Sequence, residues 1–148
     1  ADAAFDVVWS QSAAMNIADR VAFYGEIHRV LKPGGTFSIS EMAAGNGGAP
    51  IFPVPWAREK SLSFLLPPDE VRRLVEAAGF RITGWVDETG ALLAWRDRMR
   101  EVARTQPRPA LGPHIVLGSD MGERAANAMR NLAEKRCTGL LVTAQRPA

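Results

Sequence analysis

The feature that most constrains the fold is a short apolar run near the start of the chain, Phe5–Ser10. The run combines β-branched and aromatic residues, which is typical of a strand covered on both faces. A polar turn, Ser10-Gln11-Ser12, follows it, and residues 19–31 then place apolar side chains at helical spacing. Pro33-Gly34 ends that helix, and the alternating residues of Thr36–Met42 predict a second strand. Strand, helix and strand in this order begin a layered α/β pattern.

The same alternation continues through the rest of the 148 residues. The predicted elements are a helix from Pro67 to Gly79, a strand over Phe80–Glu88, a helix over 90–104, a helix over 120–136 opened by a capping box of Asp120 and Glu123, and a strand over Leu140–Ala144. Strands that alternate with helices predict an α/β domain with helices on both faces of its sheet. A chain of this length fits one domain, residues 1–148.

Composition and charge argue against several classes of function. Basic residues exceed acidic ones by only two, 18 against 16, so we expect no nucleic-acid partner. No apolar run approaches the ~18 residues of a membrane helix, and no basic, apolar and small-residue succession typical of a signal peptide opens the chain. Cys137 is the single cysteine, which excludes an internal disulfide and favours a reducing compartment. We therefore predict a cytoplasmic protein with no membrane segment.

Residues 43–66 interrupt the alternation with a long connection. Its first part, residues 43–58, is crowded with glycine and proline and contains Phe52 and Trp56. Connections of this length are usually functional or disordered. Two hypotheses follow, a functional loop and a loop that its aromatic residues simply anchor.

Three motifs resemble the class I S-adenosylmethionine-dependent methyltransferases. FDVVWSQSAAMNI, starting at Phe5, is similar to their fourth-strand motif, EIHRVLKPGG to the helix and turn that lead into strand five, and LPPDEVRRLVEAAGF to the helix that follows. The likeness is greatest to the small-molecule branch that includes the ubiquinone/menaquinone and the sarcosine/dimethylglycine methyltransferases, and it covers residues 5–89. The resemblance implies the C-terminal half of a Rossmann-like sheet, with strands in the order 4-5-7-6 and the last strand antiparallel.

By this resemblance the cofactor-binding strands of the N-terminal half are absent. The chain contains no Gly-x-Gly-x-Gly after a strand, does not begin with Met, and reaches strand-like sequence at Phe5. We therefore expect a truncated domain that is inactive alone and binds S-adenosylmethionine weakly or not at all. The Phe5–Ser10 strand would be an unpaired apolar edge, which predicts a homo-oligomer through that edge or pairing with the missing N-terminal half.

The resemblance also places a cofactor site at the first polar turn. Open α/β sheets bind ligands beyond the carboxyl ends of their strands, and the family's matching positions border the methionine portion of the cofactor. We therefore predict cofactor contacts from Ser10, Gln11 and Ser12 and from Met15. The alternatives are a polar turn that caps a strand and a methionine that fills the core. Glycine-methylating relatives often carry an acid and a histidine where this chain has Ser12 and Asn16, which argues against an amine acceptor.

Four residues are candidates for the substrate side of the site. Glu41, at the end of the second strand, is suited to orient a substrate or to accept a proton, and the alternative is an exposed strand-end carboxylate. In the family the 43–66 region is a lid over the substrate. There, Phe52 and Trp56 would bind a planar or apolar acceptor and Arg58 an acidic one.

The remaining reactive side chains carry no motif. His28 and His114 have no spaced partners for a metal site or a catalytic triad, so we predict structural or solvent-exposed roles and no bound metal. Cys137 has the features of a small buried apolar residue. Trp95 and Met99 share a helical spacing, which indicates core or interface packing rather than a cofactor site.

The sequence thus favours a methyltransferase that acts on a small molecule, with this chain as its substrate-side part. Methyl transfer is an in-line displacement that mainly requires alignment and exclusion of water, so the lack of a catalytic dyad is compatible with it. The alternative is a non-enzymatic association module derived from a methyltransferase half. A nicotinamide-dependent dehydrogenase is disfavoured, because the sequence has no dinucleotide-binding fingerprint.

Overall fold

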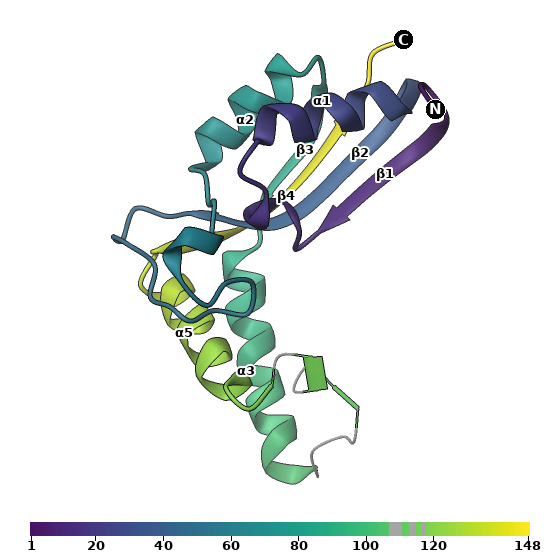
Figure 1. Cartoon of the computed structure of the whole chain (residues 1–148). Coiled ribbons are helices and arrows are strands. Elements are labelled where there is room, and N and C mark those ends of the chain that lie inside the picture. Colours follow the sequence, from purple (N-terminus) through teal and green to yellow (C-terminus); the bar gives the residue numbers. More distant parts are fainter. Residues whose placement is uncertain (107–110, 113–114, 117) are drawn as a thin grey trace.

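The computed structural model describes residues 1–106, 111–112, 115–116 and 118–148. Its main elements, shown in Figure 1, are β1 (Phe5–Gln11), α1 (Arg20–Val30), β2 (Leu31–Ala44), α2 (Pro68–Ala77), β3 (Arg81–Asp87), α3 (Thr89–Thr105), α5 (Met121–Ala133) and β4 (Cys137–Gln145). Short 3-10 turns lie at Ala14–Asn16 and Lys60–Leu62. The α/β class and the order of elements predicted from the sequence are confirmed. β2 begins earlier than expected and includes the Pro-Gly-Gly segment.

Two helix starts test the capping predictions. Asp19 caps α1 as expected, and its Oδ1 accepts a hydrogen bond of 2.8 Å from the backbone N–H of Ala22. The predicted capping box of Asp120 and Glu123 is wrong, since the side chain of Asp120 makes no cap hydrogen bond to α5. Its Oδ2 lies 2.7 Å from Nη1 of Arg58 instead, so a tertiary ion pair has replaced the local contact.

The sheet has four strands in the order β1-β2-β4-β3. β1 runs parallel to β2 with Trp9 opposite Ser38, while β4 runs antiparallel to both β2 and β3. This arrangement agrees with the expected order 4-5-7-6 and its antiparallel last strand. β1, β2 and β3 therefore all end at the edge of the sheet where β4 begins, which we call the carboxyl edge.

The two crossover helices α1 and α2 share one face of the sheet. The connections from β1 to β2 and from β2 to β3 cross the sheet in the same direction, so right-handed crossovers place both helices on the same side. Their core positions are Tyr24 and Ile27 of α1, Val71 and Val75 of α2, and alternate residues of β2 and β4 such as Phe37, Ile39, Val142 and Ala144.

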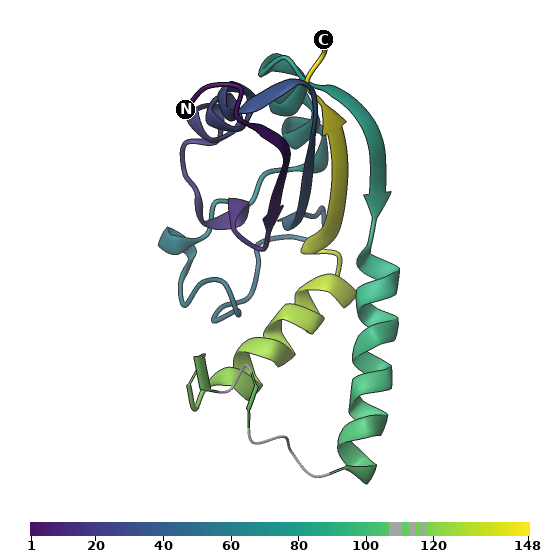
Figure 2. The ribbon, with the colours of Figure 1, turned by 90° about the vertical axis from the view of Figure 1, so that its right-hand side faces the viewer.

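The other two helices extend away from the sheet. Figures 1 and 2 show α3 leaving the end of β3 and α5 returning to the start of β4, both beyond the carboxyl edge. α3 has no buried residue along its 17 positions. A search of the described residues finds no helix that is both long and apolar enough to cross a membrane.

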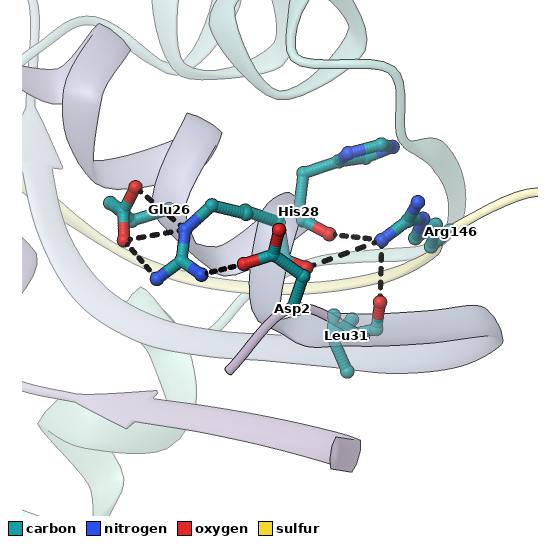
Figure 3. A network of polar contacts seen from close by, with 6 residues as sticks. Asp2, Glu26, His28, Leu31 and Arg146 are labelled. Atoms are coloured by element: carbon teal, nitrogen blue, oxygen red, sulfur yellow. Dashed lines mark hydrogen bonds and ion pairs between the residues drawn. The ribbon is translucent and has the colours of Figure 1, made fainter. Parts of the chain in front are cut away.

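The C-terminal end of α1 is closed by a residue from the far end of the chain. Nη1 of Arg146 donates to the backbone carbonyls of Leu31 at 2.6 Å and His28 at 2.7 Å, and more weakly to that of Arg29 at 3.4 Å (Figure 3). These carbonyls lack partners within the helix, and a cation there also opposes the negative end of the helix dipole. Arg146 thus joins the end of β4 to α1.

Replacing Arg146 by glutamine removes the charge at this helix end. We expect the free energy of unfolding to fall by about 1–2 kcal/mol, because hydrogen bonds to a charged group are worth roughly 1.5–3 kcal/mol and this site is half-exposed. Urea unfolding followed by circular dichroism measures the change. Arg104→Gln, on the exposed part of α3, is the matched control and should stay within about 0.5 kcal/mol of the wild type. Equal stability of the Arg146 variant and the wild type would contradict the role given to this residue.

Candidate functional site at the carboxyl edge of the sheet

The predicted polar turn lies at the carboxyl edge. Ser10 is half-buried, whereas Gln11 and Ser12 are exposed. Ser12 has a positive φ of 52°, an uncommon conformation for a residue with a side chain, and its backbone N–H donates to the carbonyl of Ser40 at 2.8 Å. The turn is therefore held against the end of β2, with polar groups open to a ligand beyond the sheet.

The long connection lies directly beside this turn. Nδ2 of Asn16 donates to the backbone carbonyls of Trp56 at 2.7 Å and Leu62 at 3.0 Å. In addition, the backbone N–H of Phe64 donates to the carbonyl of Met15 at 2.8 Å. These contacts place residues 56–64 next to the segment that follows β1, although the two are about 40 positions apart in the chain.

One face of α5 anchors the first half of the same connection. Asn131 is completely buried; its Oδ1 accepts from the N–H of Ile51 at 2.8 Å and its Nδ2 donates to the Ile51 carbonyl at 2.9 Å. Asn127 donates to the carbonyl of Pro53, and Arg124 donates to the carbonyls of Val54 and Pro55 at 2.8 Å each. Residues 124, 127 and 131 lie on one side of a helix, so α5 binds the main chain of this segment over five residues.

The three predicted substrate-side residues on this segment are differently placed. Phe52 and Trp56 are half-buried, and Nε1 of Trp56 donates to the Ser63 hydroxyl at 3.0 Å. Arg58 is exposed, and Asp120 neutralises its guanidinium. The structure thus favours the anchored-loop hypothesis for the aromatic residues, and Arg58 already has an anionic partner within the chain.

Glu41 and Met15 are buried rather than open to a ligand. Glu41 is 4% exposed and Met15 is 2% exposed. Oε2 of Glu41 lies 2.6 Å from Nη2 of Arg20, and Nη1 of Arg20 also contacts the Tyr24 hydroxyl at 3.2 Å. Glu41 points to the helix-covered face of the sheet, because it lies two residues from the core positions Ile39 and Ala43 of β2 and side chains two apart on a strand share a face. The geometry favours a structural role for Glu41 and the core-filling alternative for Met15.

Burial is the main cause of the pKa shifts around this ion pair. Desolvation raises the pKa of the Glu41 carboxyl above its ordinary value, although Arg20 opposes the shift. Desolvation, together with the Glu41 charge, likewise raises the pKa of the Tyr24 phenol. Tyr24 therefore stays neutral. The cluster ties the start of α1 to the end of β2 and so positions the polar turn between them.

The other reactive side chains form no second site. His28 packs edge-on against Phe80 with ring centroids 5.2 Å apart, and burial lowers its pKa. Cys137 is buried, and desolvation raises its thiol pKa to about 11, so the thiol is protonated at neutral pH. His114 lies outside the described residues. Within the described ranges, no three His, Cys, Asp or Glu side chains come together to hold a metal ion.

The residues present match one side of a site for S-adenosylmethionine. Ser10, Gln11 and Ser12 offer hydroxyl, amide and backbone groups at the correct edge of the sheet. The glycine-rich turn that approaches such a cofactor is absent from the sequence, and β1 has no strand partner on its outer side among the described residues. The described set therefore does not make a complete cofactor site.

Sequence reasoning missed the contacts that assemble this edge. Asn16, Asn127 and Asn131 are the side chains that hold the long connection. A spacing of polar residues on one face of a predicted helix, Arg124-x-x-Asn127-x-x-x-Asn131, was the available signal. It does not by itself identify the distant main chain to which those side chains bind.

Comparisons with known proteins find similarity to methyltransferases. A family model described as "Methyltransferase domain" matches residues 1–39. The dimethylglycine N-methyltransferase of Parasynechococcus marenigrum (strain WH8102) is 34% identical over 104 residues, which are 70% of this chain and 37% of that protein. The chain thus spans well under two thirds of that relative's length.

Two solved structures share the fold. Phosphoethanolamine N-methyltransferase 2 of Haemonchus contortus, in complex with phosphomonomethylethanolamine and S-adenosylhomocysteine, matches 99% of this chain and 35% of its own with a TM-score of 0.70 and 19% identity. A (4+2)-cyclase matches 99% of this chain and 51% of its own with a TM-score of 0.65 and 23% identity. Because these two proteins differ in reaction, the fold alone does not identify what an individual member does.

Replacing Asn131 by leucine tests the anchor between α5 and the long connection. The side chain keeps its size, but the N–H and the carbonyl of Ile51 lose their partners. An unsatisfied buried group costs about 1–3 kcal/mol, so we expect the free energy of unfolding to fall by roughly 2–4 kcal/mol. Asn127→Leu, which removes one half-buried hydrogen bond, should cost about 1 kcal/mol. Equal losses in the two variants, measured by urea unfolding, would contradict the central place given to Asn131.

Proposed function

We propose that this chain, which is similar to methyltransferases, forms the substrate-side part of an S-adenosylmethionine-dependent enzyme that methylates a small molecule. The observation that supports this proposal most is the assembly at the carboxyl edge. The exposed polar turn and the long connection come together there, and Asn16 joins them. The dimethylglycine and phosphoethanolamine N-methyltransferases are relatives whose names give small acceptors.

In this proposal the chain's own residues align the reactants and exclude water. Methyl transfer requires the acceptor atom, the methyl carbon and the leaving group in line, and holding them so lowers the barrier without a proton-transfer group. Ser10, Gln11 and Ser12 bind at the donor side, residues 43–66 cover the acceptor side, and the buried Arg20–Glu41 pair positions the turn between them. S-adenosylmethionine supplies the methyl group when it is bound.

The first experiment is a calorimetric titration of the 148-residue chain with S-adenosylmethionine up to millimolar concentrations. We expect no saturable one-site binding while circular dichroism shows a folded chain, because the sequence contains no glycine-rich turn for the cofactor. Saturable binding would overturn the expectation that this chain alone lacks a complete cofactor site. The reading frame upstream in the gene is the companion test. A strand followed by Gly-x-Gly there supports the enzyme, whereas its absence contradicts the enzymatic proposal.

A second candidate function, that of an association module, is favoured by the exposure of β1. Phe5, Val7 and Trp9 are 54%, 62% and 70% exposed, and β1 pairs on one side only among the described strands. A strand with unpaired backbone groups and large apolar side chains is a template for another strand. We propose that β1 pairs with another chain, either a second copy or a segment that completes the sheet.

Sedimentation velocity at micromolar concentrations tests this pairing. We expect the wild-type chain to sediment as a dimer and Trp9→Lys to sediment as a monomer, because a lysine on an edge strand opposes strand pairing. Val21→Lys is the matched control, since Val21 is 69% exposed on α1 and lies outside the edge. A monomeric wild type would overturn association through a second copy, and equal behaviour of the two variants would exclude β1 as the interface.

A further inference from the structure

A hollow of about 590 Å³ lies between α3 and α5, beyond the carboxyl edge. Its wall on α3 includes Trp95, Met99 and Ala103, and its wall on α5 includes Met121, Ala126 and Met129. This volume is in the range of small-molecule sites, and a mostly apolar lining is typical of them. Trp95 remains 52% exposed, so the aromatic ring is open to a ligand that enters the hollow.

The sequence produces this hollow through a mismatch in side-chain size. Gly122, Ala125 and Ala126 line it from α5 and leave space opposite the long side chains of α3. Methionines contribute from both helices, and their flexible thioethers adapt to the shape of a ligand. The spacing of Trp95 and Met99 thus reflects the wall of a hollow as well as helix packing.

The base of the hairpin is fixed, so the hollow has a defined place relative to the sheet. The backbone N–H of Gly139 donates to the Thr89 hydroxyl at 3.0 Å, and a side chain at Gly139 would collide with Leu92 of α3. On the other side, Pro55 of the anchored connection forms part of the wall, and Arg124 of α5 binds its carbonyl. The hollow therefore adjoins the assembly described at the carboxyl edge.

Positive charge lies at this apolar hollow. Arg96 and Arg100 both line it. Arg96 pairs with Asp97 at 2.8 Å. The side chain of Arg100 makes no direct ion pair or hydrogen bond with the described residues, although the Asp97 charge acts on it from a longer distance. A guanidinium without a direct partner beside an apolar wall is suited to bind a carboxylate or phosphate through charge-assisted hydrogen bonds.

We propose that this hollow binds an anionic amphiphile, a small molecule with an apolar body and one carboxylate or phosphate group. The body packs against Trp95 and the methionines, and the anion pairs with Arg100, with Arg96 beside it. The sequence predicted that Arg58 binds an acidic acceptor, but Asp120 neutralises Arg58. In this proposal Arg100 binds the acidic group instead. The binding of this ligand is independent of the proposed function. Only the further step, that the ligand is the methyl acceptor, rests on the proposed function.

Charge also distinguishes this ligand from a second copy of the chain. Across residues 95–105, α3 carries Arg96, Arg98, Arg100 and Arg104 against Asp97 and Glu101. Packing two such helices together would bring like charges close, which opposes association. An anion meets a complementary potential at the same place.

Titration calorimetry with octanoate and with the neutral 1-octanol tests the proposal on the 148-residue chain. We expect saturable octanoate binding, and a dissociation constant at least about tenfold higher for 1-octanol or for Arg100→Gln, as expected for loss of a charge-assisted pair. Arg98→Gln is the matched control. It removes the same charge from the same helix, but Arg98 does not line the hollow, so its affinity should equal the wild type's. Ala126→Phe fills the hollow and should abolish binding of both compounds.

Several outcomes would overturn the site. They are the absence of saturable octanoate binding to a folded chain, equal affinity for octanoate and 1-octanol, and equal effects of Arg98→Gln and Arg100→Gln. A dimer that Ala126→Phe dissociates would identify a second copy as the occupant. If Ala126→Phe does not fold, the comparison of Arg98→Gln with Arg100→Gln still tests whether the hollow binds the anion. Octanoate binding by a chain whose parent transfers no methyl group rejects the proposed function alone, whereas methyl transfer without octanoate binding rejects this site alone.

Discussion

The arrangement of the carboxyl edge depends on how α5 binds the long connection. Asn131 satisfies both backbone groups of Ile51 from a completely buried position, and Asn127 and Arg124 continue the contact toward Pro55. Glycine- and proline-rich main chain cannot pair its polar groups within a helix or a sheet, so side chains must do so. Because α5 leads straight into β4, this contact links the connection, the α3–α5 hairpin and the centre of the sheet.

Two surfaces are left without partners by this architecture. The crossovers place α1 and α2 on one face of the sheet, and β1 is an edge strand whose side chains Phe5, Val7 and Trp9 are exposed. Small residues on α5 leave the hollow beside α3. The first is a strand edge and favours another polypeptide. The second is an open apolar hollow near arginines and favours a small anionic molecule. Both are surfaces that no described part of the chain covers.

The candidate site was predictable in part. Ser10 and Gln11 end a recognisable strand and Ser12 follows it, and their position at the carboxyl edge is a consequence of strand direction. Glu41 was misleading because its place at a strand end does not tell which face of the sheet it points to, and an ion pair with Arg20 buries it. Arg58 has the chemistry to bind an anion, but Asp120, which is 62 positions away, already pairs with it.

The sequence by itself determined the α/β class, the resemblance to methyltransferases and the order of the elements, because hydrophobic periodicity, helix-ending glycines and the strand–helix–Pro-Gly-Gly motif are local signals. It also determined that β1 is an apolar strand. Only the tertiary structure decided that both crossover helices share a face, that α5 holds the long connection, and that Asp120 pairs with Arg58. These outcomes depend on contacts between residues far apart in the chain, whose pairing no local pattern specifies.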